Sequence, residues 1–520
     1  MNDIEVKING ERVDIDPNNV VAADFQTNDI GDLSQMKADV TSTITLLDTA
    51  RNHRIMKNAA TLGSNATIQL GKINASVLFR GLPLMANGKA YLKGAKKGEY
   101  SINILSGNYD LFDSLKDKKL SDFDFSAYNL NMTPSDYRSH YLNTSGVCYP
   151  IQHTGDFFWQ GETEANHALR PDNEIHMVTQ VPHFYIKSII NEIISQSGFT
   201  KTGAMFSEER YDRMVLSLVP PSGTMLVGTG LRTIKVKDWM PDILAVDFIK
   251  ILLTMFGAFI STIENTVYFI QIKENYENEP RDWSAKYDSS EEPSIAWEIS
   301  YAQTNKFKHA PDINDLGEVI RTSVVYDVDY DIEDDEILSD NLNLSLEKTV
   351  IETPVEPSRV VEIDPTRNAW PWLPCHNYAG VSGGDIYDFI IAGSYDIFLL
   401  YVKMSFEPQY VLRFFVMVDY TDGNTYDFWT TNNIGASSRW FSSTTIRTCY
   451  FSDLKLHPTA VASTPTNLQL GWTYLLNDYW FPIENSMLKN PTKVVAKFNL
   501  TAADTNAGTK SANAKIVRFI

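Results

Sequence analysis

Short stretches that alternate between apolar and polar residues recur along most of the chain, and turn-forming residues separate them. Alternation with a period of two is the pattern of a half-buried β-strand. It predicts strands at residues 43–46, 101–105, 267–272 and 494–500. We therefore expect a mainly β protein of the α+β class, in which helices are few.

Two segments depart from this alternation and place apolar residues at the spacing of one helix face. The first runs from about residue 184 to 197 and ends before Gly198, and the second follows Asp247, a predicted N-cap, and ends before Gly257. The repeated positions are Ile186, Ile189, Ile190, Ile193 and Ile194 in the first segment, and Phe248, Ile251, Leu252, Met255 and Phe256 in the second. Both segments are predicted to be amphipathic helices. A glycine and a strand-like stretch follow each of them, which suggests that one helix-plus-strand unit occurs twice.

Aromatic residues concentrate between residues 370 and 481, which hold 25 of the 61 aromatic residues and six of the ten tryptophans. Two long strands are predicted there, at 395–406 and 410–420, followed by a turn at 421–424. We expect this segment to be a separate antiparallel β-sandwich.

The charge of the chain is strongly negative but unevenly distributed. The 520 residues carry 45 Lys and Arg against 65 Asp and Glu, a formal net charge of −20. Residues 51–120 hold 12 basic and four acidic residues, whereas residues 271–340 hold six basic and 19 acidic ones. A negative field repels nucleic-acid phosphates, which argues against a DNA-reading protein and suits a surface past which DNA moves without binding. A solvated acidic surface is the simpler interpretation.

The sequence predicts no membrane anchor, no secretory signal, no disulfide framework and no cysteine zinc site. The longest near-continuous apolar run, residues 251–260, is about half the length that a membrane-spanning helix needs. The first ten residues lack the basic and apolar stretches of a secretory signal, so we expect folding in the cytoplasm. Cys148, Cys375 and Cys449 lie far apart and form no CxxC pair, which excludes a disulfide framework and a cysteine zinc site.

Candidate catalytic and metal-binding residues are few, and no cofactor is predicted. Residues 380–384 match GxSxG, but the flanking segments lack the strand and helix that present a catalytic serine, so a glycine-rich loop is favoured. Asp327, Asp329 and Asp331 have the spacing of a calcium-binding loop without its turn glycine or bidentate glutamate. A solvated strand face is the default for this acidic run, with a weak divalent-cation site as the alternative.

Five segments, read in order, carry a resemblance to a known family: residues 28–59, 75–125, 181–200, 238–260 and 481–505. One phrase in the first segment consists of Thr49, Asn52, Ile55, Asn58 and Ala59. A turn phrase in the second consists of Ser106, Gly107, Asn108, Asp110, Leu111 and Phe112. In these phrases the chain resembles the baseplate-hub or tail-tip proteins of tailed bacteriophages, particularly those from phages and prophages of Bacteroides-like bacteria.

The resemblance implies tail-tube-like β-barrel domains with two amphipathic helices, to which the aromatic-rich sandwich is added. Because 520 residues exceed one ordinary core, we expect several domains. The predicted division is an N-terminal hub β-barrel domain (1–125), a connecting α+β region (126–240), a second hub-like α+β domain with the acidic strand region (241–350), the sandwich insertion (360–480) and a C-terminal strand returning to the hub core (481–520).

The same resemblance implies a non-enzymatic virion structural protein of the phage tail, assembled in the host cytoplasm. Such proteins form homo-oligomeric rings around the DNA passage and contact tube or adaptor proteins, fibres or a spike. The basic segment 51–120 is expected to face an acidic partner, and Trp429, Trp440 and Trp472 are candidates for a fibre or glycan contact. The alternatives are a glycan-binding cell-surface or receptor-binding protein, with sugars stacked on these tryptophans, and a tail-associated wall hydrolase.

Overall fold

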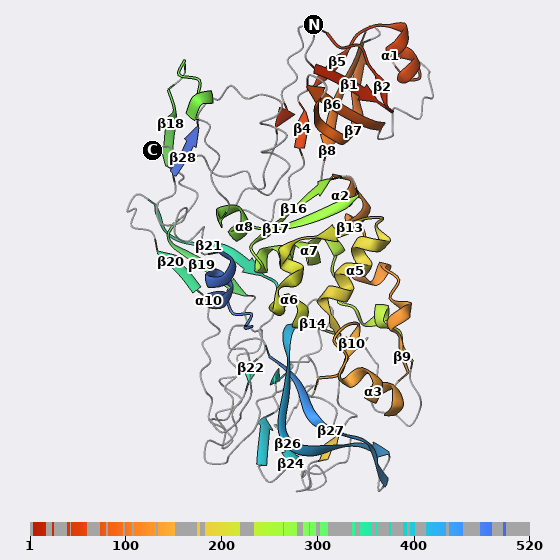
Figure 1. The fold of residues 1–520 in the computed structure, drawn as a ribbon, viewed down its shortest axis with the longest axis vertical. Coiled ribbons are helices and arrows are strands. Elements are labelled where there is room, and N and C mark those ends of the chain that lie inside the picture. The colour runs from red at the N-terminus through yellow and green to blue at the C-terminus, as the bar shows by residue number, and fades with distance from the viewer. Residues whose placement is uncertain are drawn as a thin grey trace.

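A computed structural model of the protein describes part of the chain and is mostly β, with several antiparallel sheets and few helices (Figure 1). This mostly β secondary structure is the one that the alternation of apolar and polar residues predicts. None of the described helices is long and apolar enough to cross a membrane. The described residues are 4–16, 23–24, 39–41, 43–59, 73–79, 82–96, 99–106, 109–131, 134–150, 174–176, 182–218, 233–263, 265–277, 284–290, 292–297, 302–309, 335–338, 344–355, 359–360, 374–375, 388–392, 396–400, 412–432, 436–450, 468–480 and 492–495.

The N-terminal residues form an eight-stranded antiparallel sheet, at the upper end of Figure 1. The strand order is β2 (Glu11–Arg12), β1 (Ile4–Ile8), β6 (Ile73–Phe79), β7 (Leu82–Lys96), β8 (Glu99–Ser106), β4 (Asp39–Thr41) and β3 (Ala23–Asp24), and β5 (Ile44–Leu46) also pairs with β8. Among the described strands β2 and β3 do not pair with each other, so the sheet is open at its ends. A closed barrel stays a prediction.

One face of this sheet and helix α1 (Ala50–Ile55) enclose a hydrophobic core. In β1 the buried residues are Val6 and Ile8, while Glu5 and Lys7 between them are partly exposed, as strand alternation requires. Each fully buried aliphatic side chain contributes about 1.5–3 kcal/mol. We call the sheet and α1, within residues 4–106, the N-terminal unit.

A second and larger core gathers residues from Leu111 to Trp480, and we call the residues that form it the main unit. Its six-stranded sheet follows the order β10 (Val147–Cys148), β12 (His183–Tyr185), β14 (Met214–Ser217), β26 (Phe414–Asn432) and β11 (Glu174–His176), with β27 (Ala436–Tyr450) also on β26. The long β26–β27 hairpin extends toward the lower end of Figure 1. The base of this hairpin pairs with β14, and its buried side chains belong to the main core. The base of the hairpin is thus continuous with the main core, and a separate β-sandwich in the aromatic segment stays a prediction.

The predicted turn at 421–424 is wrong, because β26 runs through it. Thr421 lies opposite Thr445 and Tyr426 lies opposite Ser443, so the partner strand has fewer residues over this stretch. The surplus residues form an irregularity within the strand, which bends the strand without reversing it.

Two helices lie at the predicted positions, and each precedes a strand of one three-stranded sheet. They are α5 (Ile186–Gln196) and α7 (Ala245–Met255), and the predicted apolar stripes are buried in both. Gly198 and Gly257, with φ of 83° and 50°, follow them in the left-handed conformation that ends many helices. The helix-plus-strand units meet in the sheet β13 (Thr200–Thr202), β17 (Thr266–Gln271) and β16 (Ala258–Ile263), in which β13 and β16 both pair with β17.

The predicted N-cap of the second helix is one turn too late. The residue at the N-cap of α7 is Leu244, which has no side-chain cap, and Asp247 lies within the first turn, where Lys250 donates to it at 3.3 Å. A carboxylate in the first turn still stabilises the helix through the helix dipole.

A further three-stranded sheet consists of β20 (Asp335–Leu338), β19 (Ala302–His309) and β21 (Ser345–Thr353). The two-stranded pairs are β9 (Leu130–Asn131) with β15 (Thr233–Ile234), β18 (Ser294–Trp297) with β28 (Thr492–Val495), β22 (Arg359–Val360) with β23 (Pro374–Cys375), and β24 (Asp388–Ala392) with β25 (Asp396–Leu400). The shorter helices are α2 (Tyr109–Leu115), α3 (Pro134–Tyr141), α6 (Glu209–Arg213), α8 (Ile272–Glu277) and α10 (Trp472–Leu475), which a π-turn, η8 (Leu476–Trp480), continues. The five domain boundaries stay predictions.

Candidate functional site

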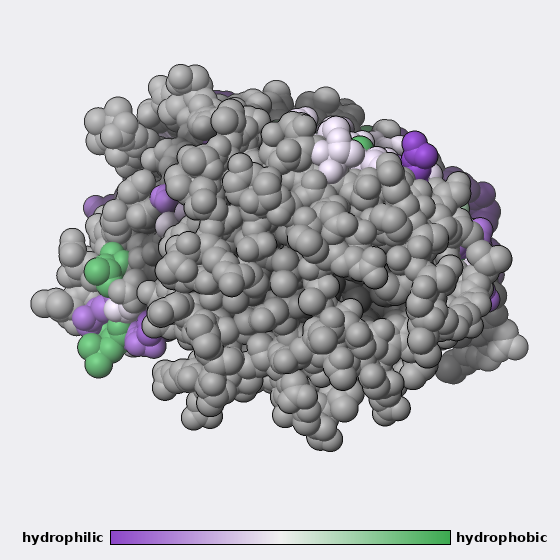
Figure 2. All heavy atoms as spheres, turned by 90° about the horizontal axis from the view of Figure 1, so that it is seen from below, coloured by the Kyte–Doolittle hydropathy of each residue, from purple (hydrophilic) through white to green (hydrophobic). Residues whose placement is uncertain are grey.

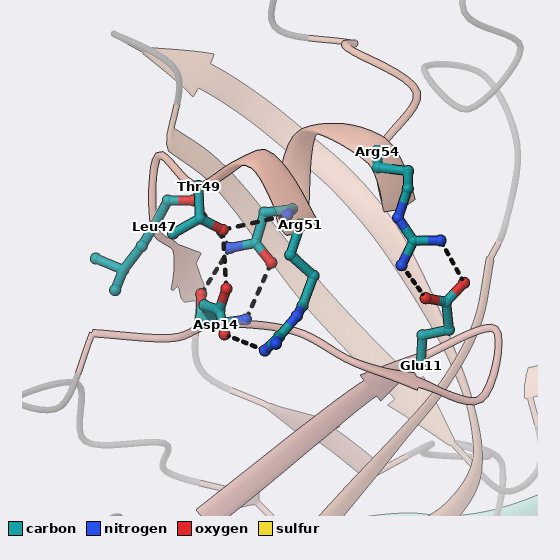
Figure 3. A network of polar contacts seen from close by, with 7 residues as sticks. Glu11, Asp14, Leu47, Thr49, Arg51 and Arg54 are labelled. Carbon is teal, nitrogen blue, oxygen red and sulfur yellow. Dashed lines mark hydrogen bonds and ion pairs between the residues drawn. The ribbon is translucent and has the colours of Figure 1, made fainter.

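Helix α1 is fixed in the N-terminal unit by a network of polar contacts (Figure 3). Thr49 is its N-cap: the hydroxyl accepts from the Asn52 backbone N–H at 3.2 Å and donates to Asp14 Oδ2 at 2.9 Å. The Asn52 side chain is fully buried. Its Oδ1 accepts from the Asp14 backbone N–H at 2.9 Å, and its Nδ2 donates to the carbonyls of Asp14 and Leu47 at 2.7 and 2.9 Å. Both amide donors and the amide acceptor of Asn52 are therefore satisfied.

The other residues of the same phrase also have structural roles. Ile55 and Ala59 are buried in the core of the N-terminal unit. Asn58 has φ of 55°, the left-handed region that asparagine tolerates better than most residues. The phrase from Thr49 to Ala59 thus specifies how α1 begins, how it docks and how the chain leaves it.

Two arginines on α1 are neutralised by the turn that faces them. Arg51 donates to Asp14 at 2.7 Å, and Arg54 pairs with Glu11 (Figure 3). Both pairs are largely exposed to solvent. Exposed pairs of this kind contribute about 0–1 kcal/mol, so their main effect is to remove free positive charge from this face of α1.

His53 links α1 to strand β8. Its Nδ1 lies 2.8 Å from the Tyr100 hydroxyl and its Nε2 lies 2.5 Å from Asp48 Oδ1. Tyr100 is fully buried and lies opposite Ala95 of β7. An aspartate, histidine and tyrosine in a row resemble a proton relay, but a buried tyrosine hydroxyl cannot meet a substrate, so we interpret the row as a structural brace.

The end of the β7–β8 hairpin projects beyond this brace. Residues 93–96 of β7 and Glu99 of β8 are all exposed, and we call them the hairpin tip. Lys93 donates to the Thr43 hydroxyl at 3.3 Å, and Lys96 lies opposite Glu99 in the register. Within the described residues neither lysine forms an ion pair with a carboxylate. The tip therefore carries two exposed lysines and one exposed glutamate.

A buried arginine anchors the β26–β27 hairpin to the main unit. Arg447 donates to both carboxylate oxygens of Asp419, its register partner, at 2.6 and 2.7 Å. It also donates to the carbonyl of Asn143, and its backbone N–H donates to the Tyr141 hydroxyl at 2.9 Å. Arg447 is buried whereas the Asp419 side chain is 40% exposed, so removal of Asp419 would leave a buried positive charge without its carboxylate partner.

A cysteine and a histidine meet in the main core, which the sequence did not indicate. Cys449 Sγ lies 4.0 Å from His183 Nε2, and both side chains are fully buried. Burial raises the pKa of the Cys449 thiol well above its usual value. A nucleophilic cysteine needs a thiolate that a substrate can reach, so this pair lacks both requirements of a cysteine hydrolase.

Trp472 lies in the core and so does not present a surface for glycans. It is fully buried, and its ring packs against Phe307, His309 and Trp480. The indole face that a sugar ring would need is already covered by these side chains. The prediction for Trp472 is therefore corrected: it is a core residue that docks the segment 468–480.

The remaining candidates are placed only in part. Trp429 lies on β26 opposite Arg439, and Trp440 lies on β27 near a register shift. Asp327, Asp329 and Asp331 and the GxSxG match at 380–384 lie outside the described residues. Within the part of the chain that the structure describes, no cluster of histidine, cysteine or acidic side chains could hold a metal ion.

Two exposed leucines mark the sheet β20–β19–β21. Leu346 of β21 is 78% exposed and Leu338 of β20 is 59% exposed. Figure 2 shows hydrophobic side chains beside hydrophilic ones at the left margin, the side on which Figure 1 places β20. Single exposed leucines are common on protein surfaces, so these two do not define an interface.

The sequence analysis did not identify the residues whose contacts stabilise each unit internally. Asp14, Asp419 and Arg447 carry no local signal, because each meets partners between 28 and 306 positions away. Asn52 is the exception, since it stands inside the phrase that carries the resemblance.

The similarity that comparisons with known proteins give is weak, and it comes from solved structures. No protein-family model matches the chain, and none of the curated proteins matches it. Among solved structures, the chain is similar to the crystal structure of the 43 kDa tail protein of prophage MuSo2 from Shewanella oneidensis, with 8% identity and a TM-score of 0.29. The match covers 68% of this chain and 72% of that one. Similarity at this level does not establish a shared fold.

Proposed function

We propose that the chain is a virion structural protein, a hub or tip component of a bacteriophage tail of the kind found in phages and prophages of Bacteroides-like bacteria. The observation that carries the proposal is the ordered set of five sequence phrases. Thr49, Asn52 and Ile55, from the first phrase, cap, dock and bury α1. These residues determine how the N-terminal unit folds. Agreement with the family at such positions therefore supports membership of it more strongly than agreement at exposed positions does.

The proposed architecture is a ring of identical subunits built on tail-tube-like β-barrel domains, with an aromatic-rich sandwich. An open sheet supports this proposal, because edge strands carry unpaired backbone groups that a neighbouring subunit can pair. Among the described strands, β2 and β3 stand at the two ends of the eight-stranded sheet and do not pair with each other. Head-to-tail contacts between identical subunits produce closed rings when the rotation between them closes.

The proposed ring surrounds the DNA passage and does not bind DNA in a sequence-specific way. Residues 105–520 contain 33 basic and 54 acidic residues, a charge that disfavours stable contact with phosphates. The proposed neighbours are tube or adaptor proteins, fibres and a spike. No enzymatic step is part of this function, and the proposed location is the virion tail after assembly in the host cytoplasm.

Light scattering coupled to size exclusion, followed by negative-stain imaging of the same fraction, tests this proposal. We expect a closed ring of several copies with a central hole. A stable monomer whose tryptophan fluorescence is quenched by polysaccharides would contradict it and would point to the glycan-binding alternative. Release of fragments from peptidoglycan would point to a wall hydrolase.

A further inference from the structure

Lys201 lies on the core side of an edge strand. Its strand, β13, stands at one end of the sheet β13–β17–β16 and, among the described strands, pairs only with β17. In the parallel register Lys201 lies beside Val267, which is buried in the main core, while Thr200 and Thr202 on either side of it are exposed. The side chain of Lys201 therefore leaves the sheet on its core face, and it is half-buried.

The amine of this side chain contacts an aromatic ring. Lys201 Nζ lies 3.4 Å from the centroid of the Phe206 ring. Phe206 belongs to the 3₁₀-helical turn η5 (Ala204–Ser207), which follows β13, and packs against Phe269 and Tyr211 of the main core. A ring face attracts a cation, but it replaces only part of the water that an ammonium group loses on burial.

No carboxylate compensates for this burial. Within the described residues Lys201 has neither a hydrogen-bond acceptor nor an ion pair. The acidic residues of α5, η5 and α6 and between these elements have other partners: Glu192 with Tyr128, Glu208 with Lys273, Glu209 with Arg213 and Asp212 with Lys187. Burial therefore lowers the pKa of Lys201 to about 8.

Two other lysines of the main unit show what Lys201 lacks. Both are half-buried beside aromatic rings. Lys187 Nζ lies 5.1 Å from the centroid of Tyr185, and Lys273 Nζ lies 4.8 Å from that of Tyr479. Each of these two lysines also pairs with a carboxylate at 2.6 Å, which keeps its amine protonated.

Lys118 has a looser version of the arrangement at Lys201. It is half-buried and, within the described residues, forms no ion pair with a carboxylate. Its Nζ lies 5.4 Å from the centroid of Phe123, against 3.4 Å for the contact of Lys201 with Phe206. Lys118 therefore shows, in the same chain, what half-burial does without a close ring contact.

We propose that Lys201 is an acylation site, at which the neutral amine takes the acyl group of an acyl phosphate. The nitrogen attacks the carbonyl carbon and forms a C–N bond, the bond from that carbon to the phosphate oxygen breaks, and phosphate leaves while the nitrogen gives one proton to water. A desolvated lysine is activated for such an attack. The product is an uncharged amide, so acylation removes the charge that the apolar surroundings disfavour. This site does not depend on the function proposed above.

A structural role is the competing explanation. A lysine that points inward from an edge strand hinders pairing with a further strand. That role requires the charged ammonium, whereas acylation requires the neutral amine. The reactivity of Lys201 near neutral pH therefore distinguishes the two roles.

Competitive labelling of the full-length protein tests the proposal. The protein is treated with a limiting amount of acetyl phosphate at several pH values, and acetylation of each lysine is measured by peptide mass spectrometry. At about pH 7.5, an amine with a pKa of about 8 is roughly one-quarter neutral, whereas an ordinary lysine is neutral in about one molecule in a thousand. Because a less basic amine is also a weaker nucleophile, we expect Lys201 to react about tenfold faster than Lys187 and Lys273.

The variant Lys201→Arg confirms the assignment. It keeps the positive charge but is not deprotonated, so the acetyl label should disappear from its peptide. The rates at Lys187 and Lys273 and the thermal unfolding of the protein should stay as in the wild type.

Three results would overturn the inference. The first is a rate at Lys201 no higher than at Lys187 and Lys273. The second is a rate at Lys118 equal to that at Lys201, which would assign the reactivity to half-burial alone. The third is a rate at Lys201 that still rises tenfold per pH unit above about pH 9, as it does for an ordinary lysine.

Discussion

At the scale of single residues, Asn52 stabilises the N-terminal unit through several hydrogen bonds made by one side chain. Its buried amide joins the start of α1 to two separate stretches of backbone, at Asp14 and Leu47. The carbonyls of Asp14 and Leu47 also accept backbone N–H groups, from Leu47 and Thr49, whereas the Asp14 N–H donates to Asn52 Oδ1. Truncation of Asn52 therefore leaves the Asp14 N–H without this acceptor and removes one donor from each carbonyl.

We expect Asn52→Ala to lower the free energy of unfolding of the N-terminal unit by about 1–3 kcal/mol, the cost of leaving one buried donor without its hydrogen bond. Urea unfolding followed by far-UV circular dichroism measures this loss. Arg54→Ala is the matched control, since it removes an exposed ion pair on the same helix and should cost at most about 1 kcal/mol. Equal effects of the two variants would contradict the role given to Asn52.

Gly203 is a second position at which the addition of one atom, a Cβ, affects the stability of the fold. It adopts φ of 147°, and a Cβ built there would lie 2.1 Å from the carbonyl oxygen of Phe269. We expect Gly203→Ala to destabilise the main unit by about 2 kcal/mol or more, through strain and overlap with backbone. Gly94→Ala should change stability by less than about 1 kcal/mol, because a Cβ there meets nothing within 4 Å. The midpoint of urea unfolding by tryptophan fluorescence reports the Gly203 effect, and the midpoint by far-UV circular dichroism reports the Gly94 control. An unchanged fluorescence midpoint in Gly203→Ala would refute the prediction.

At the scale of elements, the contact between β19 and the segment 468–480 contains a buried histidine. His309 Nε2 lies 3.0 Å from the carbonyl of Leu470, so it carries the proton and donates, while Nδ1 accepts from the Thr353 hydroxyl at 2.7 Å. Burial lowers the pKa of His309 to about 4. The neutral ring, stacked on Trp472, is the form that the fold stabilises.

This lowered pKa makes the main unit sensitive to mild acid. Between about pH 6.5, where the unfolded histidine titrates, and about pH 4, the unfolded chain binds a proton that the folded chain does not. Stability therefore falls as pH falls through this range, by about 2 kcal/mol from pH 7 to pH 5 for this residue. His309→Gln, which keeps a donor and an acceptor but does not titrate, should lose this part of the pH dependence. Urea midpoints of both proteins at the two pH values test it, and identical pH dependence would contradict it.

Elements with a strong local pattern were predictable, and elements defined by distant partners were not. The apolar stripes of α5 and α7 follow from residue spacing alone, and the glycines after them mark where they end. The turn expected at 421–424 failed because composition cannot show whether a partner strand continues alongside. The burial of Trp472 was hidden for the same reason, since Phe307 and His309 come from a strand more than 160 positions earlier.

At the scale of the whole molecule, two cores share one chain. The core of the N-terminal unit ends with Ile104 and the core of the main unit begins with Leu111. All ten tryptophans lie at position 159 or beyond, so none belongs to the N-terminal unit. The two units therefore have different spectroscopic signatures.

We expect unfolding curves from tryptophan fluorescence and far-UV circular dichroism to differ, because fluorescence reports only the main unit while circular dichroism reports both. Asn52→Ala should shift the part of the dichroism curve that fluorescence does not follow, and Gly203→Ala should shift the part that both share. Superimposable curves that move together in both variants would show a single cooperative unit instead.

The span of the main core also determines when each part of the protein can fold during synthesis. The N-terminal core is complete once residue 104 has left the ribosome, but the main core needs Trp480, about 370 residues later. At roughly 5–20 residues per second, translation of that interval takes on the order of 20–70 s. From the synthesis of α5 and α7 until the end of that interval, their apolar faces lack the strands and rings that finally cover them, so we expect the nascent chain to bind chaperones that hold exposed hydrophobic segments.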